Sequence, residues 1–211
     1  MLNLPARSTN ACSSFNQLLK LELMTKRLSR KFFTRPTLTV AKDLLGKYLV
    51  REISTKILSG KIVESEAYIG PKDKASHAFG GKITLRNQAE YLIGGHVYIY
   101  LVYGMYWQLN IATSQKGRPE CVLIRAIEIE NQKHQLANGP GKLCQYLHLD
   151  KSFYGEDLTK SKRLWIKNRT VIIKSSQIIK TSRVGIDYAG PVWSKKPWRF
   201  YIKGNPAISH R

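Results

Sequence analysis

Two carboxylates and a phenol fall on the same side of one short apolar segment. In the segment 63–68 (VESEAY), side chains alternate so that Glu64, Glu66 and Tyr68 share one face of an extended strand. A carboxylate in such a place can act as a general base, and an aromatic ring beside it can stack on a nucleobase. The alternative is a solvated sheet face on which both glutamates pair with lysines. The spacing alone leaves both interpretations open.

Aromatic side chains are concentrated in one later segment. An extended strand over residues 96–103 places Tyr98 and Tyr100 on one face. Tyr103 falls on the other face, where Gly104 indicates a turn. Ordinary sheet packing explains any one of these rings, because aromatic residues favour strands. Together they also fit a surface on which rings stack on bases, and Tyr103 fits packing least well because hairpin tips are usually exposed.

The loop between these segments contributes a histidine and two cations. His77, Lys82 and Arg86 lie in a stretch rich in Gly, Pro and Lys. The two cations are of the type that contacts DNA phosphates, and they are equally typical of solvated surface charges. A lone loop histidine is usually a surface residue, and no second histidine or cysteine stands at metal-ligand spacing from His77. We therefore predict no metal site and no bound cofactor.

The composition indicates an anionic partner. Among 211 residues, 35 Lys and Arg stand against 14 Asp and Glu, which gives a formal net charge of +21. A compact chain tolerates such an excess chiefly when a polyanion covers it, so nucleic acid is the first candidate partner and an anionic membrane surface the second. No stretch approaches the roughly 18 consecutive apolar residues that suggest a membrane-spanning helix, so no span is expected.

The cysteines indicate a reducing compartment. Cys12, Cys121 and Cys144 are odd in number and share no Cys-x-x-Cys spacing, which argues against a disulfide framework and against a zinc cluster. Reduced thiols are typical of a cytosolic protein. The expected location is cytoplasmic, beside the nucleoid in a bacterium, or nuclear in a eukaryote.

The chain is expected to form one domain preceded by an extension. Residues 1–30 begin with a stretch rich in Ser and Asn and lack the apolar segment of a secretory signal, so we expect them to be disordered. Met24 is a second candidate start of translation. With 43% hydrophobic residues in the whole chain, residues 31–211 can build a core of their own.

The periodicity of apolar residues predicts an α+β fold with a mainly antiparallel sheet. One helix is expected to be capped by Thr37 and to end at Gly46, and a second to open at Asn138–Gly141. A turn is expected at Ser59-Gly60, and a tight one at Gly104-Met105. The expected strands are Tyr48–Ile53, Ile57–Tyr68, His96–Tyr103, Tyr106–Ser114, Cys121–Glu130, Val171–Ile179 and Trp198–Ile202.

Taken in order, these segments resemble the alkyladenine (3-methyladenine) DNA glycosylase family. The resemblance covers roughly residues 31–205. Two departures concern the DNA-facing loop and the pocket wall: Leu85 stands where many members have proline, and Trp107-Gln108 differ beside the hairpin turn. The matching stretches are AKDLLGK (41–47), VESEAYIGP (63–71), Asp73 to His77, YIYLVYGMY (98–106), Asn110, VLIRA (122–126), NGPGKLC (138–144), RVGI (183–186) and KPWRFY (196–201).

The resemblance implies a curved sheet with surrounding helices, a protruding β-hairpin and a role for each matched residue. Glu66 matches the family's general base, and Arg125 matches a basic residue near the catalytic water and phosphate. Tyr103 matches the tyrosine that wedges into the duplex. The base pocket is implied to consist of Tyr68 and His77, which stack the flipped base, of Tyr100, which closes the pocket, and of Asn110, which reads the base edge. Lys82 and Arg86 are the expected contacts to the DNA backbone.

The expected function is that of a base-excision-repair DNA glycosylase. It takes alkylated or deaminated purines, such as 3-methyladenine, hypoxanthine or ethenoadenine, out of double-stranded DNA and hydrolyses the N-glycosidic bond with a water activated by Glu66. No lysine lies within the matched catalytic motif, so a monofunctional enzyme is expected, acting as a monomer. The competing class is a non-catalytic basic protein of the same fold that binds DNA or RNA, for which Glu66 has no use.

Overall fold

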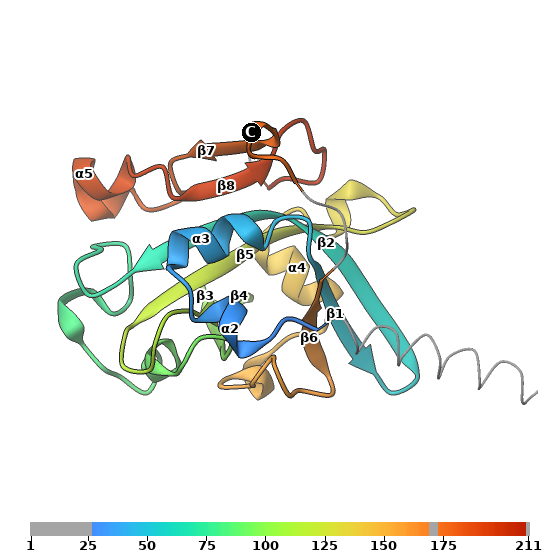
Figure 1. Ribbon diagram of the computed structural model, residues 1–211, viewed down its shortest axis with the longest axis horizontal. Helices are drawn as coiled ribbons and strands as arrows, with labels where there is room; N and C mark the ends of the chain where they lie inside the picture. The colour runs from blue at the N-terminus through green and yellow to red at the C-terminus, as the bar shows by residue number, and fades with distance from the viewer. Residues whose placement is uncertain (1–26, 169–172, 210–211) are drawn as a thin grey trace, which may run out of the picture.

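The computed structural model describes residues 27–168 and 173–209, which form one mixed α/β domain (Figure 1). The part of the chain that is described contains eight strands and four α-helices. The helices are α2 (Arg30–Phe33), α3 (Thr37–Asp43), α4 (Pro140–Tyr146) and α5 (Gly190–Ser194). The strands are β1 (Tyr48–Ile53), β2 (Lys56–Ile69), β3 (Val97–Val102), β4 (Tyr106–Ala112), β5 (Glu120–Glu128), β6 (Leu164–Lys167), β7 (Ile178–Thr181) and β8 (Arg199–Ile202).

All strand pairs of this sheet are antiparallel, as the sequence predicts. The main path runs β3-β4-β5-β2-β1-β6, and β8 pairs with both β2 and β7. Strand β2 is the longest, and it is bordered by β5 on one side and by β1 and then β8 on the other. Its register against β5 shifts on both sides of Glu64, a bulge that locally increases twist. β2 therefore holds its two glutamates at the centre of the sheet.

The largest hydrophobic core lies between the sheet and helices α3 and α4. Helix α3 packs against β2 and β5, and α4 packs against β4 and β5. Fully buried leucine, isoleucine and valine side chains from these elements exclude water from this layer, which is the main favourable term in folding. In Figure 1, β7, β8 and α5 lie together along one edge of this layered body.

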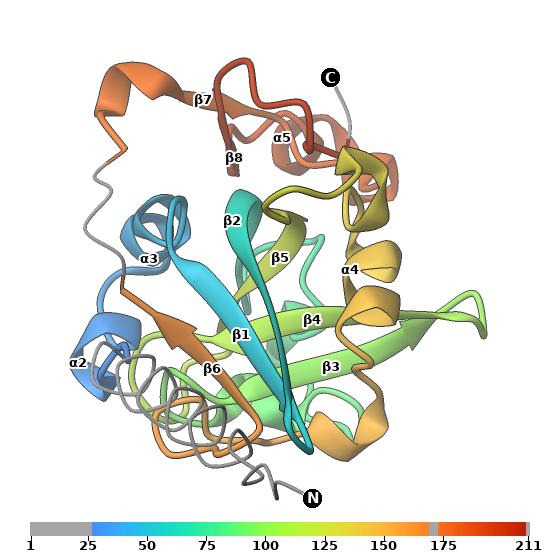
Figure 2. The same cartoon turned by 90° about the vertical axis from the view of Figure 1, so that its right-hand side faces the viewer.

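Strands β3 and β4 form the expected hairpin, which extends beyond the rest of the domain (Figure 2). Val102 pairs with Tyr106, and the turn holds Tyr103 at φ 52° and Gly104 at φ 70°. Two successive left-handed residues are typical of the turn that matches the twist of a hairpin. Glycine adopts this conformation readily, but tyrosine rarely does. The side chain of Tyr103 is 88% exposed, so packing does not hold it there.

Three local predictions are wrong. No turn lies at Ser59-Gly60, because β2 continues through both residues and the chain turns between Ile53 and Lys56. A Cβ atom on Gly60 would lie 2.8 Å from Ile127 Cδ1, so the glycine marks close packing of neighbouring strands. Thr37 does not cap α3, because its hydroxyl contacts Thr113 and Glu120 instead.

The third correction concerns the strand placed at Val171–Ile179. The described strand is β7, which begins at Ile178, and Ser175–Gln177 form a short 3-10 turn before it. Residues 169–172 lie outside the described residues. Strand β6 was missed, although it pairs with β1 and is buried along its whole length.

The expected extension, residues 1–30, is largely outside the described residues, which begin at Arg27. Residues 27–30 contact the domain. The backbone of Arg27 forms an antiparallel β-bridge with that of Lys167, and the Leu28 side chain is buried in the core. Arg30 forms an ion pair with Asp157 at 2.5 Å. Within the described ranges, no helix has the length and apolar character needed to cross a bilayer.

Candidate active site

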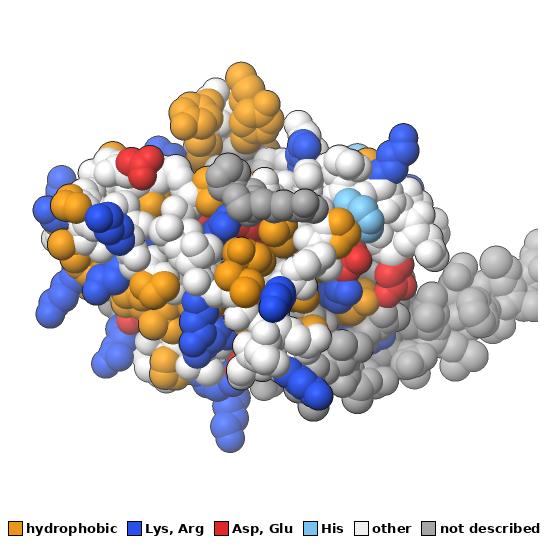
Figure 3. Space-filling view, turned by 90° about the horizontal axis from the view of Figure 1, so that it is seen from above, with side chains coloured by type: hydrophobic (Ala, Val, Ile, Leu, Met, Phe, Trp, Pro, Cys, Tyr) orange, Lys and Arg blue, Asp and Glu red, His pale blue; other side chains and the backbone are white. Residues whose placement is uncertain are grey.

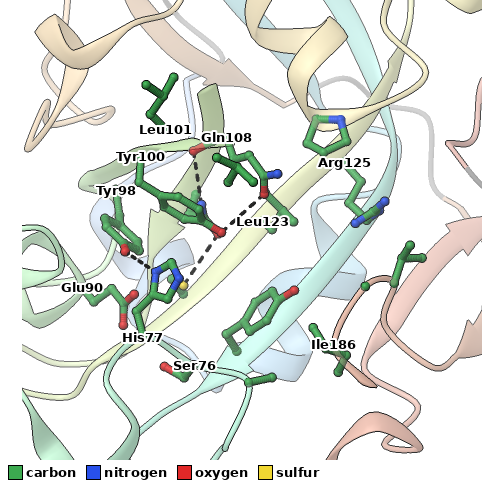
Figure 4. Close-up of a pocket in the computed structure, with 18 of the residues that line it drawn as sticks. Ser76, His77, Glu90, Tyr98, Tyr100, Leu101, Gln108, Leu123, Arg125 and Ile186 are labelled. Atoms are coloured by element: carbon green, nitrogen blue, oxygen red, sulfur yellow. Dashed lines mark hydrogen bonds between the residues drawn. The ribbon is translucent and has the colours of Figure 1, made fainter. Parts of the chain in front are cut away.

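A pocket of about 470 Å³ opens between the β3–β4 hairpin, the loop that follows β2 and the segment that precedes α5 (Figure 4). Its wall includes most of the residues that the sequence predicts for base binding. Tyr68, His77, Tyr100, Asn110 and Arg125 all line it. Tyr103, at the exposed tip of the hairpin, also borders this cavity. So does Arg86, one of the two residues predicted to contact the DNA backbone.

Glu66 lies directly behind this wall and has no exposed surface (0%). Its Oε1 accepts a hydrogen bond from the Val184 backbone N–H at 2.9 Å. Its Oε2 accepts one from the Tyr68 hydroxyl at 2.9 Å and lies 3.4 Å from Arg125 Nη1. Because Tyr68, Arg125 and Val184 line the pocket, the carboxylate is one side chain away from it. The alternative interpretation, in which these glutamates lie on a solvated sheet face and pair with lysines, is therefore wrong.

Glu64 serves the neighbouring structure rather than the pocket. Its Oε1 lies 3.2 Å from Arg125 Nε and 3.0 Å from Arg199 Nη1. Its Oε2 accepts a hydrogen bond from the Ser209 backbone N–H at 2.6 Å. Burial lowers the pKa of Arg125, but the carboxylates of Glu66 and Glu64 outweigh it and leave that pKa raised. Arg125 is thus a fixed cation at the pocket wall, held by two carboxylates.

A buried ion pair joins two walls of the pocket. The guanidinium of Arg183 contacts both oxygens of Asp73, at 2.5 and 2.9 Å, and neither side chain is exposed. The same guanidinium lies 4.6 Å from the ring centre of Tyr68. Asp73 belongs to the loop after β2, and Arg183 begins the segment that carries Val184. This pair fixes the position of the ring and of the N–H that contact Glu66.

The opposite side of the pocket is aromatic. His77 Nδ1 lies 2.6 Å from the Tyr98 hydroxyl, and its ring meets the Tyr100 ring edge-on at 4.6 Å. Burial, and secondarily the charge of Arg86, lowers the pKa of His77 to about 4. The histidine is therefore neutral at physiological pH. Burial likewise raises the pKa of Tyr68 well above its usual value, so that this ring remains a phenol.

Asn110 lies on the floor of the pocket, on β4, and is 1% exposed. Its Nδ2 donates to the Gln108 carbonyl at 3.3 Å, and its Oδ1 lies 3.9 Å from the Cys121 thiol. The Tyr100 hydroxyl donates to Gln108 Oε1 at 3.4 Å. The contacts with Gln108 and Cys121 hold the Asn110 amide at the pocket wall. Gln108, one of the departures from the family pattern, thus takes part in the pocket wall.

Lys82 is the predicted site residue that lies away from the cavity. It is exposed on the loop before Arg86, and its backbone carbonyl accepts hydrogen bonds from Asn87 and Tyr91. The loop is thereby ordered while the ammonium group faces solvent. On the face seen in Figure 3, Lys and Arg side chains are spread widely and acidic ones are few, in keeping with the net charge of +21.

Several pocket residues were not predicted. Tyr98 was recognised only as a neighbour of Tyr100, and the role of the Asp73–Arg183 pair had no sequence signal because 110 positions separate its members. Glu90 was not considered at all. Among the described residues, no group of three or more His, Cys, Asp or Glu side chains is placed to hold a metal ion.

Comparison with known proteins assigns this arrangement to a family. The model of the methylpurine-DNA glycosylase family matches residues 31–206. A protein of Clostridium novyi is 44% identical over 206 residues, covering 88% of this chain and 100% of the relative. One of Natranaerobius thermophilus is 43% identical over 197 residues, with coverages of 87% and 98%. Both carry the name "Putative 3-methyladenine DNA glycosylase". The chain therefore belongs to the methylpurine-DNA glycosylase family and is a hydrolase that acts on N-glycosyl bonds of DNA.

Proposed function

We propose that this enzyme removes alkylated or deaminated purines from double-stranded DNA by hydrolysis, as a monofunctional glycosylase. The observation that carries the proposal is the position of Glu66, a buried carboxylate held by Arg125 and Tyr68 directly behind an aromatic pocket. A protein that only binds nucleic acid has no use for such a group.

The proposed reaction begins with rotation of the damaged nucleotide out of the stack and into the pocket. The rings of Tyr68 and His77 stack on the base, and electron-rich tyrosine faces attract positively charged alkylpurines. A water molecule then attacks the sugar C1′, the N-glycosidic bond breaks with its electron pair passing to the base, and the water's proton passes to Glu66. Arg125 and the Val184 N–H hold the carboxylate in position for this transfer.

The nucleophile is proposed to be water rather than an amine. Among the described residues that line the pocket, none is a lysine. A lysine is the group that forms a Schiff base with the sugar. Its absence from this part of the chain supports base release without strand cleavage.

Release of free bases from a panel of duplexes tests the proposal. Each duplex carries one lesion, 3-methyladenine, 7-methylguanine, hypoxanthine or ethenoadenine, and the reaction contains a chelator. We expect free base and an intact abasic strand from at least one lesion, and none from undamaged duplex. Tight binding with no release from any lesion would support the non-catalytic alternative, and strand cleavage would contradict the monofunctional reaction.

The basic surface predicts a strong dependence of DNA affinity on salt. Each neutralised phosphate contributes about −0.9 to the slope of log K against log salt for duplex DNA. With a net charge of +21, we expect a slope steeper than about −3 on undamaged duplex. Binding titrations at several salt concentrations measure it. A nearly flat dependence would show that the basic surface meets something other than DNA.

Asn110 is proposed to set selectivity against guanine-type bases. Its amide is held by Gln108 on the pocket floor, where it would crowd an exocyclic 2-amino group but leave room for hypoxanthine. We expect Asn110→Ser to raise the removal of guanine-type bases relative to hypoxanthine. Single-turnover rates on both substrates test this. An unchanged ratio would mean that the chemistry of the leaving group alone sets the ranking.

A further inference from the structure

Glu90 differs from every other buried carboxylate in the described residues. Four acidic side chains are fully or almost fully buried there. Three are paired with arginine: Glu64 and Glu66 with Arg125, and Asp73 with Arg183. Glu90 is 1% exposed, lines the pocket and forms no ion pair within the described ranges. Its Oε2 is buried and has no hydrogen-bond partner among them.

Glu90 has no ion-pair partner among the described residues, and the nearby cation is Arg86, whose charge acts on its neighbours His77 and Tyr98. It lies on the 3-10 turn Gln88–Tyr91, which packs against β3, β4 and β5. In Figure 4 its carboxyl lies beside Tyr98 and His77, at the opposite end of the pocket from Arg125. His77 is neutral, since its pKa is about 4. The titratable groups that interact with Glu90 are Asp73, Tyr91, Tyr98, Tyr100, Cys121 and Tyr154.

A buried carboxylate without a cation is costly, and this one is held neutral by its burial. Desolvation raises the pKa of Glu90 to about 8, although the hydroxyls of Tyr98 and Ser76 act in the opposite direction. Buried charges in proteins are normally paired or coordinated. Because the carboxyl borders a cavity, the missing positive charge can arrive with whatever fills that cavity.

We propose that Glu90 is a specificity-determining residue that makes this pocket favour positively charged alkylated purines over neutral damaged purines. The inference rests on the proposed function, since it assumes that a purine enters the pocket. A purine methylated at N3 or N7 carries a formal positive charge while it is attached to the sugar, whereas hypoxanthine and ethenoadenine do not. The cationic base completes the ion pair that the free protein lacks, and a neutral base leaves it incomplete.

The proposal has a definite dependence on pH. In the free pocket Glu90 is protonated below pH of about 8, and a cation beside it lowers its pKa. Entry of a cationic base therefore releases a proton, so the advantage of the cationic base increases as the pH rises towards 8. Entry of a neutral base releases none.

The test compares wild type with Glu90→Gln and Glu90→Met at about pH 6 and about pH 8.5. Single-turnover release of 3-methyladenine from methylated duplex is measured against release of hypoxanthine from a matched duplex. Glutamine keeps the shape of the side chain without its charge, and methionine needs no hydrogen-bond partner in a buried place. Glu128→Gln is the matched control, because it removes the same charge from a residue that pairs with Lys61 and does not line the pocket.

We expect both Glu90 variants to lower the ratio of 3-methyladenine to hypoxanthine release by at least about tenfold near pH 8.5, a size typical of a charge pair in a partly screened site. The loss should be smaller near pH 6, and the control should keep the wild-type ratio. A similar loss on both lesions, or an unchanged ratio at both pH values, would overturn the role of Glu90. Wild-type protein that released neither base would instead overturn the proposed function.

Discussion

Glu66→Gln is expected to lower the single-turnover rate of base excision by at least about 10², while binding to lesion-bearing duplex stays close to that of wild type. Glutamine keeps the acceptor oxygen that meets the Val184 N–H, but it cannot take a proton from water. The substitution replaces no side chain of the pocket wall, because Glu66 lies behind Tyr68 and Arg125. Rapid-quench excision and fluorescence anisotropy on the same duplex separate the two effects.

Glu64→Gln is the comparison that isolates the chemistry. Both glutamates are fully buried, on the same strand, and both contact Arg125. Glu64 in addition holds Arg199 and the Ser209 backbone, so its substitution should lower the melting temperature more than the excision rate. For Glu66→Gln we expect the opposite, a larger loss of excision rate than of melting temperature. If Glu66→Gln excised the base at a rate near that of wild type, Glu66 would not be the general base.

The central strands could be predicted because their physical signal is local. The alternation in VESEAY (63–68) places Glu64, Glu66 and Tyr68 on one face, and the structure agrees, with a bulge at Glu64. Burial was the part that alternation could not supply. From the sequence, a strand face bearing two carboxylates could equally be exposed to solvent. In the structure this face is buried, and Arg125 and Arg199 neutralise it from strands that are distant in sequence.

Contacts over long sequence distances account for most of what was missed. The Ser59-Gly60 pair is a common turn signal, yet Gly60 is present because Ile127 packs against it from the neighbouring strand. Glu90 lies between the predicted loop, which ends at Arg86, and the predicted strand that begins at His96, and only the folded chain shows that it is buried without an ion-pair partner among the described residues. The resemblance to a family places residues that match its motifs. It carries no information about Glu90, which lies outside the matched stretches.

Tyr103→Ser is expected to weaken excision strongly for a lesion in a well-paired duplex, and clearly less for the same lesion in a mismatch or bulge. Taking a stacked, paired nucleotide out of the duplex costs on the order of a few kcal/mol, and an inserted ring offsets part of this by filling the vacated space. Tyr103 is 88% exposed at the tip of a hairpin, on the rim of the pocket, which suits such an insertion. The inserted ring therefore helps most in a well-paired duplex, where taking the nucleotide out of the stack costs the most free energy.

The competing interpretation, a packing role for Tyr103, makes a different prediction. A packing residue would, when replaced, lower the melting temperature and reduce excision of both substrates equally. Tyr103 adopts φ 52°, which tyrosine tolerates poorly, and its exposed ring gains no burial in return. Serine at this place should therefore leave the melting temperature close to that of wild type. Tyr103→Phe is the matched control, because it keeps the ring and should keep the rate. Equal losses on paired and mismatched substrates with an unchanged melting temperature would mean that the ring contacts DNA without entering it.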